Sequence, residues 1–287
     1  MAAPDTAPGA PVKRTEPLVP LYEHPGLPRW GLPPALAALY GGDLGFTEPC
    51  LYANFVASLD GVVALGPEFP SSGSTISARE PADRFLMGLL RACADAVLIG
   101  AGTLRASPHH RWTPEHVYPP AAADYARLRL RRSRPPEPEL VVVTASGALP
   151  TDHPALRAGA LIVTTTAGAD RLAGRLPTSC AVVPLGDGPV LRLASVVDAI
   201  LARGHTAVLS EAGPLVLGQL VGDGLLDELF LTVSPVLAGR AGTIRHGLIA
   251  GLELLPNRRE GADLISARRR GSYLFLRYRL RALLGRD

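Results

Sequence analysis

Short apolar runs alternate with amphipathic stretches along most of the chain. Runs typical of buried strands lie at residues 51–58, 96–99, 140–144, 160–164, 181–183, 206–210 and 226–234. Stretches with the spacing of an apolar helix face lie at residues 77–93, 193–203 and 214–221. Strands separated by helices predict an α/β fold with a mixed, mostly parallel sheet and helices on both of its faces.

Two further strand patterns, at residues 263–270 and 273–280, flank Gly271-Ser272 and predict a C-terminal antiparallel hairpin. Ser77 and Glu80 have the spacing of a capping box, which predicts that the helix at residues 77–93 begins at Ser77. Residues 66–75 are rich in Gly, Ser and Pro and predict a flexible loop.

The first 50 residues differ from the rest of the chain because they are rich in proline. Proline fixes φ and removes a backbone donor, so residues up to about 30 are expected to form an extended or disordered arm. Pro33 and Gly41 bracket one short predicted helix. The chain is therefore expected to consist of an N-terminal extension, 1–50, and a main domain, 51–287.

Composition narrows the class of protein. The chain has 287 residues, 47% of them hydrophobic, and its three cysteines lie far apart, which disfavours both a disulfide framework and a cysteine zinc site. The seven histidines lack metal-ligand spacing, and the pair His109-His110 is expected to be solvated, so no metal is expected. There is neither an apolar run long enough for a membrane span nor a secretory signal, which predicts a cytoplasmic protein without a membrane partner.

The positive charge is concentrated in arginine. Lys13 is the only lysine, and arginines gather at residues 127–134 and 258–287. Such clusters are typical of phosphate or nucleic-acid binding, but equally of a solvated helix face and of the outer face of strands. Aromatic residues make up only 5% of the chain, too few for extensive base stacking, so no nucleic-acid partner is expected. Arginine-mediated RNA binding is kept as a rival hypothesis.

Two motifs follow predicted strands. Residues 100–103 (GAGT) are either a cradle for a phosphate or a tight turn, because glycine allows close approach of backbone N–H groups to an anion. Residues 211–214 (EAGP) lead into a helix with proline in its first turn, so the free N–H groups of that helix point toward the ligand-binding edge of the sheet. The two motifs together could hold the ends of one phosphorylated cofactor.

Four segments in the same order, 57–61, 90–103, 209–214 and 225–235, resemble the reductase half of the bifunctional riboflavin-biosynthesis deaminase–reductase. The resemblance extends over residues 51–281 and is similar to stand-alone actinobacterial members of that family. It implies a dihydrofolate-reductase-like fold and makes residues 51–287 a reductase domain. The zinc-binding motifs of the deaminase half do not occur, so the chain is not expected to deaminate.

The resemblance implies an NADPH-dependent reductase that transfers a hydride to the ribosyl C1′ of a phosphorylated aminopyrimidine, and a homodimer, to which the apolar strand 229–236 would contribute. It places substrate at Arg91 and Glu211, although Arg91 could instead be a cation at a helix C-terminus. The cofactor-binding positions it implies are Val56, Val63, Gly100, Gly102, Thr103, Thr144, Gly213, Pro214, Leu215 and Gly218. Thr144 and Ser146 would offer hydroxyls to the 2′-phosphate and so favour NADPH over NADH.

The catalytic group is not assigned by the sequence, and the candidates are Asn54, Asp83 and Glu211. Asn54 stands where bifunctional relatives often carry lysine. Asp83 is either a helix-end charge or, by its resemblance to the active-site acid of dihydrofolate reductases, a group that recognises a pterin ring. A dihydrofolate or pterin reductase and a non-catalytic NADPH-binding protein are therefore kept as alternative functions.

Overall fold

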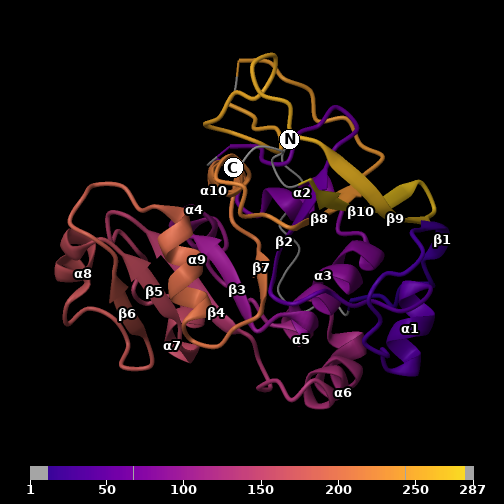
Figure 1. Cartoon of the computed structure of the whole chain (residues 1–287), viewed down its shortest axis with the longest axis horizontal. Helices are drawn as coiled ribbons and strands as arrows, with labels where there is room; N and C mark the ends of the chain where they lie inside the picture. The colour runs from indigo at the N-terminus through magenta and orange to yellow at the C-terminus, as the bar shows by residue number, and fades with distance from the viewer. Residues whose placement is uncertain (1–11, 67, 243, 282–287) are drawn as a thin grey trace.

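The computed structural model describes residues 12–66, 68–242 and 244–281, which form one ten-stranded sheet with helices on both faces (Figure 1). The strands are β1 (Val19–Glu23), β2 (Cys50–Ala57), β3 (Ala96–Gly100), β4 (Glu139–Thr144), β5 (Leu161–Thr164), β6 (Ala181–Pro184), β7 (Ala207–Ser210), β8 (Glu228–Val233), β9 (Ala262–Arg270) and β10 (Tyr273–Leu280). The helices are α1 (Pro34–Tyr40), α2 (Ser72–Ile76), α3 (Pro81–Cys93), α4 (Ala101–Arg105), α5 (Pro114–Val117), α6 (Ala122–Arg131), α7 (Pro154–Ala158), α8 (Thr166–Leu172), α9 (Leu193–Leu201) and α10 (Pro214–Gly222), with a 3-10 turn at Pro119–Ala121.

The strand order is β1-β9-β10-β8-β2-β7-β3-β4-β5-β6. The strands from β8 to β6 are parallel, whereas β10, β9 and β1 extend the sheet in antiparallel fashion. The predicted mostly parallel sheet and its C-terminal hairpin are thereby confirmed. The bounds of the strands predicted between residues 51 and 234 agree with the structure to within two residues.

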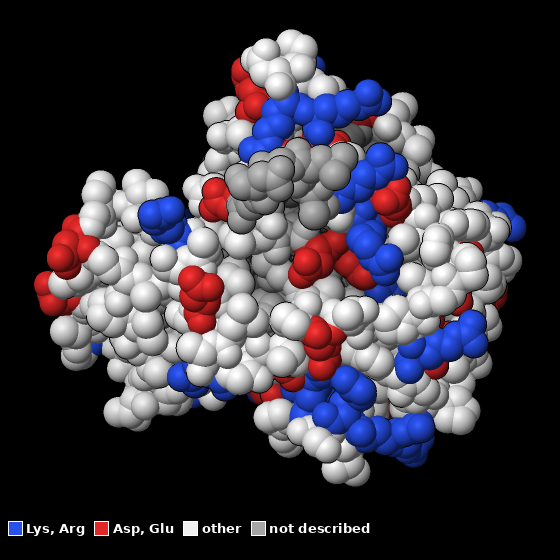
Figure 2. Space-filling model, in the orientation of Figure 1, with Lys and Arg blue, Asp and Glu red and all other residues white. Residues whose placement is uncertain are grey.

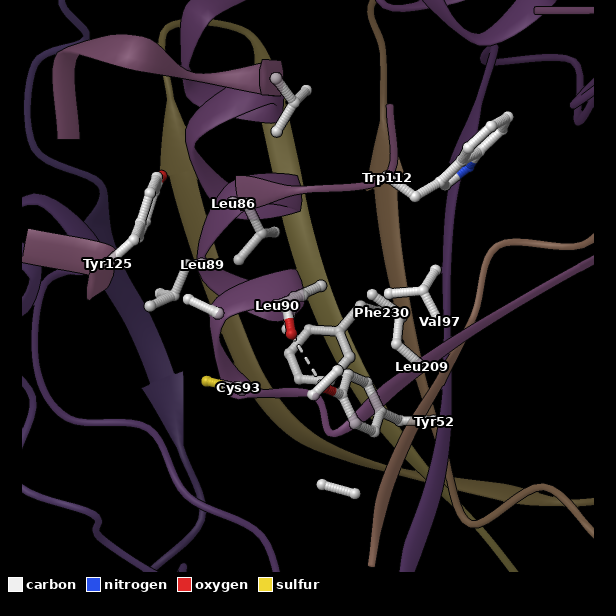
Figure 3. Close-up of a cluster of buried hydrophobic side chains, with 14 of the residues drawn as sticks. Tyr52, Leu86, Leu89, Leu90, Cys93, Val97, Trp112, Tyr125, Leu209 and Phe230 are labelled. Carbon is white, nitrogen blue, oxygen red and sulfur yellow. Dashed lines mark hydrogen bonds between the residues drawn. The ribbon is translucent and has the colours of Figure 1, made fainter. Parts of the chain in front are cut away.

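Successive side chains along the parallel strands point to opposite faces of the sheet and form two cores, one on each face. Tyr52, Val97 and Leu209 point to the face covered by α1, α3, α5 and α6. Figure 3 shows this core, in which the Tyr52 hydroxyl donates a hydrogen bond to the Leu90 carbonyl of α3 at 2.8 Å. The alternate residues of the same strands, such as Leu51 and Leu98, pack against α9 and α10 on the opposite face. Burial on both faces explains why these strands are nearly continuous apolar runs.

Helix α3 begins later than its capping-box motif predicts. Ala78 and Arg79 are left-handed, with φ of 50° and 57°, so the backbone cannot continue as a helix from Ser77. The helix starts at Pro81, where the fixed φ of proline suits the first turn, and the Glu80 carboxylate accepts a hydrogen bond from the Ala82 N–H. The capping-box prediction was therefore wrong, and Ser77 ends α2, a short helix within the predicted loop 66–75.

The described part of the N-terminal extension packs against the sheet. Strand β1 pairs with β9, and Figure 1 shows the extension beside β9 and α6. Buried arginines of the main domain bind its backbone: Arg268 donates to the Tyr40 carbonyl at 2.8 Å and Arg277 to the Gly45 carbonyl at 2.8 Å. The arm was expected to be extended or disordered; its described part, from residue 12 onward, is ordered and contains β1, and residues 1–11 lie outside the described residues.

The solvated interpretation of the arginine clusters was wrong for several of their members. Arg129, Arg268 and Arg277 are buried, and Arg129 donates to the Arg91, Ala92 and Ala94 carbonyls, which satisfies the carboxyl end of α3. Other members do face solvent, and Figure 2 shows basic side chains gathered over α6. An arginine-rich segment thus contains both exposed arginines and buried arginines that donate hydrogen bonds to backbone carbonyls.

Strand β8 lies inside the sheet, between β2 and β10, and Leu229 and Phe230 are buried within the two cores. Leu231 and Val233 of the same strand are only half-buried. The homodimer stays a prediction. Across the described ranges, no helix combines the length and the apolar character needed to cross a bilayer.

Candidate active site

The candidate active site lies at the carboxyl ends of the central parallel strands. A pocket of about 600 Å³ opens there, with walls from the segments that follow β2, β3 and β7, which are neighbours in the sheet. The chain turns to α3 on one face of the sheet after β2 and to α10 on the other face after β7. A crevice between such oppositely directed connections is the usual ligand site of an open α/β sheet.

The pocket brings together most of the residues that the sequence predicts for the site. Its lining contains Asn54, Val56, Val63, Asp83, Gly100, Gly102, Thr103, Glu211, Gly213, Pro214 and Leu215. Thr144 and Gly218 do not line it. Thr144 is buried at the end of β4, and a Cβ added to Gly218 would lie 2.4 Å from the Ala250 carbonyl oxygen. A cofactor role for these two residues stays a prediction.

Two glycines in the lining of the pocket are not required by the fold itself. Neither Gly102 nor Gly213 has a left-handed φ, and a Cβ added at either position would meet nothing within 4 Å. Gly213 is also the N-cap of α10 and provides no side chain to satisfy the first N–H groups of that helix. This backbone can therefore approach an anionic ligand closely, at a helix end whose dipole favours negative charge.

Glu211 is held at the centre of the site by Arg91. Its carboxylate accepts two hydrogen bonds, from Arg91 Nε at 2.8 Å and from Arg91 Nη2 at 2.7 Å, and its backbone N–H donates to the Leu98 carbonyl. The Arg91 side chain is 1% exposed, whereas that of Glu211 is 10% exposed toward the pocket. The bidentate geometry fixes the orientation of the carboxylate.

His110 completes the environment of Arg91 and was missed by the sequence analysis. Its Nε2 lies 2.9 Å from Arg91 Nη2 and accepts a hydrogen bond from it. Burial and the Arg91 charge lower the pKa of His110 to about 2, so the ring is neutral. The prediction of a solvated loop pair was wrong for His110, because its ring packs against Trp112 and His116.

Asp83 lies in the first turn of α3 and faces the pocket, with 4% of its surface exposed. Burial raises the pKa of its carboxyl to about 6, against the opposing effect of the Thr232 and Ser77 hydroxyls. Among the described residues Asp83 forms no ion pair, unlike Glu211, although the Asp83 charge acts on the neighbouring Arg84. The group can therefore exchange a proton near neutral pH.

A wall of the pocket comes from a segment that lies far along the chain. Ala64, in the loop after β2, forms an isolated antiparallel bridge with His246, which lines the pocket. Asp60 fixes the same segment, because its carboxylate accepts hydrogen bonds from the Ala238 and Gly239 N–H groups at 2.9 and 2.8 Å. The Ala238 N–H and the Ser58 hydroxyl lower the pKa of Asp60 to about 2. Asp60 thus shapes the pocket and does not line it.

A second cavity of about 310 Å³, which we call the side pocket, adjoins the main one. The two share Asp83, Met87, Thr103 and Glu211 in their linings. The other residues around the side pocket include Arg79, Arg84, Arg91 and His110. Within the described ranges, no group of three or more His, Cys, Asp or Glu side chains is placed to hold a metal ion.

Comparison with known proteins agrees with this architecture. Residues 49–256 match the RibD C-terminal domain family. Among solved structures, the chain is similar to RibD of Acinetobacter baumannii, with 19% identity and a TM-score of 0.62 over 85% of this chain and 60% of that chain. It is also similar to a pyrimidine reductase-like protein of Corynebacterium diphtheriae, with 21% identity and a TM-score of 0.58 over 81% of this chain and 92% of that chain.

A third similar structure is the riboflavin biosynthesis reductase Rib7 of Saccharomyces cerevisiae, with 16% identity and a TM-score of 0.56 over 87% of this chain and 95% of that chain. The chain spans only 60% of the length of Acinetobacter baumannii RibD. The comparison with curated protein sequences gives no significant match. The predicted dihydrofolate-reductase-like fold is confirmed by these likenesses, and the match over most of its length shows that the chain belongs to the RibD C-terminal domain family.

Proposed function

We propose that this chain is an NADPH-dependent reductase of a phosphorylated ribosylaminopyrimidine in riboflavin biosynthesis. The observation that carries the proposal is a single cleft lined by the open glycines Gly102 and Gly213 and by Glu211, whose carboxylate is held by Arg91. Membership of the RibD C-terminal domain family supports it. So does the likeness to a Thermotoga maritima protein described as a diaminohydroxyphosphoribosylaminopyrimidine deaminase/5-amino-6-(5-phosphoribosylamino)uracil reductase, with 17% identity and a TM-score of 0.59 over 82% of this chain and 57% of that chain.

The residues around Gly102 and Gly213 fit a dinucleotide. Backbone N–H groups near Gly102 and Gly213 and the Thr103 hydroxyl would hold phosphates, because both glycines leave space that a side chain would fill. Val56 and Val63 supply an apolar wall that excludes water from the reacting ring. When bound, NADPH supplies the hydride, and the protein contributes position and electrostatics.

The carboxyls of the cleft would orient the substrate and manage protons. Glu211 is rigidly held and accepts hydrogen bonds from amino, ring N–H or hydroxyl groups of the substrate. Asn54, which also lines the cleft, can donate a hydrogen bond to a substrate carbonyl. Reduction of a ribosyl C1′ requires a proton besides the hydride, and Asp83 is the pocket carboxyl whose pKa lies near neutrality.

The test is oxidation of NADPH in the presence of the ribosylaminopyrimidine phosphate, together with dissociation constants for NADPH and NADH. Turnover with this substrate and tighter binding of NADPH are the expected results. Equal dissociation constants for NADPH and NADH would contradict the proposed preference for NADPH. NADPH binding without oxidation in the presence of any pyrimidine or pterin would identify a non-catalytic cofactor-binding protein.

A second candidate function is reduction of a dihydrofolate or pterin ring. It is favoured by one observation: Asp83 is a buried carboxyl in the cleft without a bound cation, beside the Thr232 hydroxyl. Such a group can hydrogen-bond an aminopyrimidine edge bidentately. Binding of dihydrofolate that is abolished by Asp83→Asn would support this candidate, and a lack of response with every ring would leave Asp83 as a helix-end charge. A homodimer and a cytoplasmic location are further proposals from the family resemblance.

A further inference from the structure

The family resemblance assigns Arg91 to substrate, but its guanidinium group is already engaged within the protein. Nε and Nη2 donate to the two carboxylate oxygens of Glu211, at 2.8 and 2.7 Å. Nη1 donates to the Arg111 and Thr113 carbonyls, both at 3.3 Å. Nη2 also reaches His110 Nε2 at 2.9 Å, and the Arg91 side chain is 1% exposed. Each guanidinium N–H therefore has an acceptor inside the protein.

His110 differs from the other acceptors of Arg91 in distance and in charge. The carbonyl contacts are long for N–H···O hydrogen bonds, and Met87 Sδ, which lies 3.4 Å from Nη2, is a weak acceptor. The His110 ring is neutral, because burial and the Arg91 charge lower its pKa to about 2. A neutral acceptor fixes the guanidinium group without competing with the Glu211 carboxylate for its charge, as a second carboxylate would.

The His110 ring is itself held in one orientation. Its centroid lies 5.0 Å from that of Trp112 and 4.7 Å from that of His116, in edge-to-face contacts with interplanar angles of 79° and 84°. Its backbone N–H donates to the Ser107 carbonyl at 3.0 Å. Because arginine can only donate, Nε2 is the acceptor and the neutral ring carries its proton on Nδ1. The ring therefore presents a fixed lone pair to Arg91.

These groups lie in a definite order relative to the main pocket. Arg91 lies in the last turn of α3, and His110 lies in the segment 106–113 between α4 and α5. His110, Arg91 and Glu211 line the side pocket, but of the three Glu211 alone is part of the lining of the main pocket. A ligand in the main pocket therefore meets Glu211, with Arg91 behind it and His110 behind Arg91.

We propose that His110 is a positioning residue, which holds Arg91 so that Arg91 orients the Glu211 carboxylate, and that Arg91 acts on the substrate through Glu211 and not by direct contact. The proposal rests on the proposed function in one respect: Glu211 accepts hydrogen bonds from the substrate. Loss of the His110 acceptor would free an Nη2 N–H, allow the guanidinium group to turn and release the carboxylate from its single orientation.

The first test uses the full-length protein without any ligand. Heteronuclear NMR of the histidine nitrogens at neutral pH should show a neutral His110 ring that is protonated at Nδ1. A ring protonated at Nε2 would overturn the proposal, and this measurement needs no variant other than one that assigns the signal.

The second test is solvent exchange of the Arg91 Nε–H, whose signal is assigned by its loss in Arg91→Lys. Exchange should be about tenfold faster in His110→Leu, which corresponds to one charge-assisted hydrogen bond. His110→Gln keeps an acceptor oxygen and should restore slow exchange in part. The matched control is His109→Leu, because this exposed neighbour lines neither pocket. The Nε–H of Arg129, which donates to the Pro135 carbonyl, should not change in any variant. Unchanged exchange of the Arg91 Nε–H in His110→Leu would overturn the proposal.

The third test is a double-mutant cycle on the reaction. His110→Leu should lower kcat/KM about tenfold with Glu211 present and should have no further effect in Glu211→Gln, because it acts through that carboxylate. The dissociation constant of NADPH should stay the same. An equal loss of kcat/KM in both backgrounds would contradict the positioning role. If the wild type turned over no ribosylaminopyrimidine phosphate, the proposed function would fail, and the two NMR measurements would still decide whether His110 holds Arg91.

Discussion

Two arginine–glutamate pairs among the described residues, Arg277–Glu228 and Arg91–Glu211, lie in contrasting surroundings. Arg277 Nε lies 2.6 Å from the Glu228 carboxylate, and their side chains are 3% and 6% exposed. The Arg277 guanidinium lies over the rings of Phe46 and Phe230, at 4.8 and 5.3 Å from their centroids, and also binds the Gly45 carbonyl. This pair is enclosed on every side and joins the extension to the sheet.

The Arg91–Glu211 pair has the same chemistry, but its carboxylate borders a cavity. Water or a ligand can reach Glu211, whereas Glu228 can interact only with the groups built around it. An enclosed pair is costly to break because the remaining charge cannot be rehydrated. A pair at a cavity keeps one partner available, so identical residues serve folding in one place and recognition in the other.

Arg277→Met removes the cation of the enclosed pair and should have the largest effect. It leaves Glu228 buried without its main partner, which is expected to lower the free energy of unfolding by about 3–5 kcal/mol. Urea unfolding measures the loss. Cofactor affinity of the folded fraction should stay the same, and a loss no larger than that of an exposed arginine such as Arg175 would contradict the enclosed character of this pair.

Asp83→Asn extends the comparison to a buried carboxyl that forms no ion pair among the described residues. Since the pKa of Asp83 is raised from 3.8 to about 6, the folded state binds the proton more tightly than the unfolded state, and stability falls as pH rises between these values. The contribution amounts to ~3 kcal/mol at most. Unfolding across this range should show the variant gaining stability relative to the wild type as pH rises. Parallel curves for the two proteins would show that Asp83 is not desolvated.

Arg91→Met breaks the pair at the cavity. Its stability cost should be smaller than that of Arg277→Met, because Glu211 can regain water from the pocket. Its activity should fall further than that of Arg277→Met. Loss of the fixed orientation of the Glu211 carboxylate is expected to lower kcat/KM about 100-fold. Steady-state kinetics and unfolding are measured on the same preparation, with Arg91→Lys as the variant that keeps charge. Partial rescue of kcat by lysine without rescue of KM would support a positioning role.

The smallest effects are expected at two glycines of α10: Gly213, which is its N-cap, and Gly218, which lies within it. Gly213→Val fills space that is open in the structure and should weaken NADPH binding about tenfold with little change in stability. Gly218→Ala would bring a Cβ to 2.4 Å from the Ala250 carbonyl oxygen and should instead lower stability by about 1–3 kcal/mol. Unchanged NADPH affinity in folded Gly213→Val would assign the start of α10 a purely structural role.

The parts of the fold that sequence could predict are those with a local pattern. Buried parallel strands are continuous apolar runs, and the motifs at residues 100–103 and 211–214 follow such runs directly. Their convergence at one sheet edge follows from parallel topology, so the glycines and Glu211 of the cleft could be placed together in advance.

The structural features that the sequence did not predict depend on interaction partners that have no sequence pattern. Arg129, Arg268 and Arg277 bind backbone carbonyls, which every residue possesses, so their burial leaves no trace in the sequence. His246 and Ala64 meet across 182 positions through a single bridge. The start of α3 was mispredicted because a capping-box spacing at Ser77 competes with Pro81, and the left-handed turn between them decides the outcome.

The position of β2 in the sheet has a consequence for the order in which the protein is built. Both neighbours of this strand, β7 and β8, are made more than 150 residues after residues 50–57. The nascent chain must therefore hold an apolar strand without its partners while this long segment is synthesised. Folding dominated by such distant pairings is slow, and it leaves a long interval in which this strand can associate with other chains.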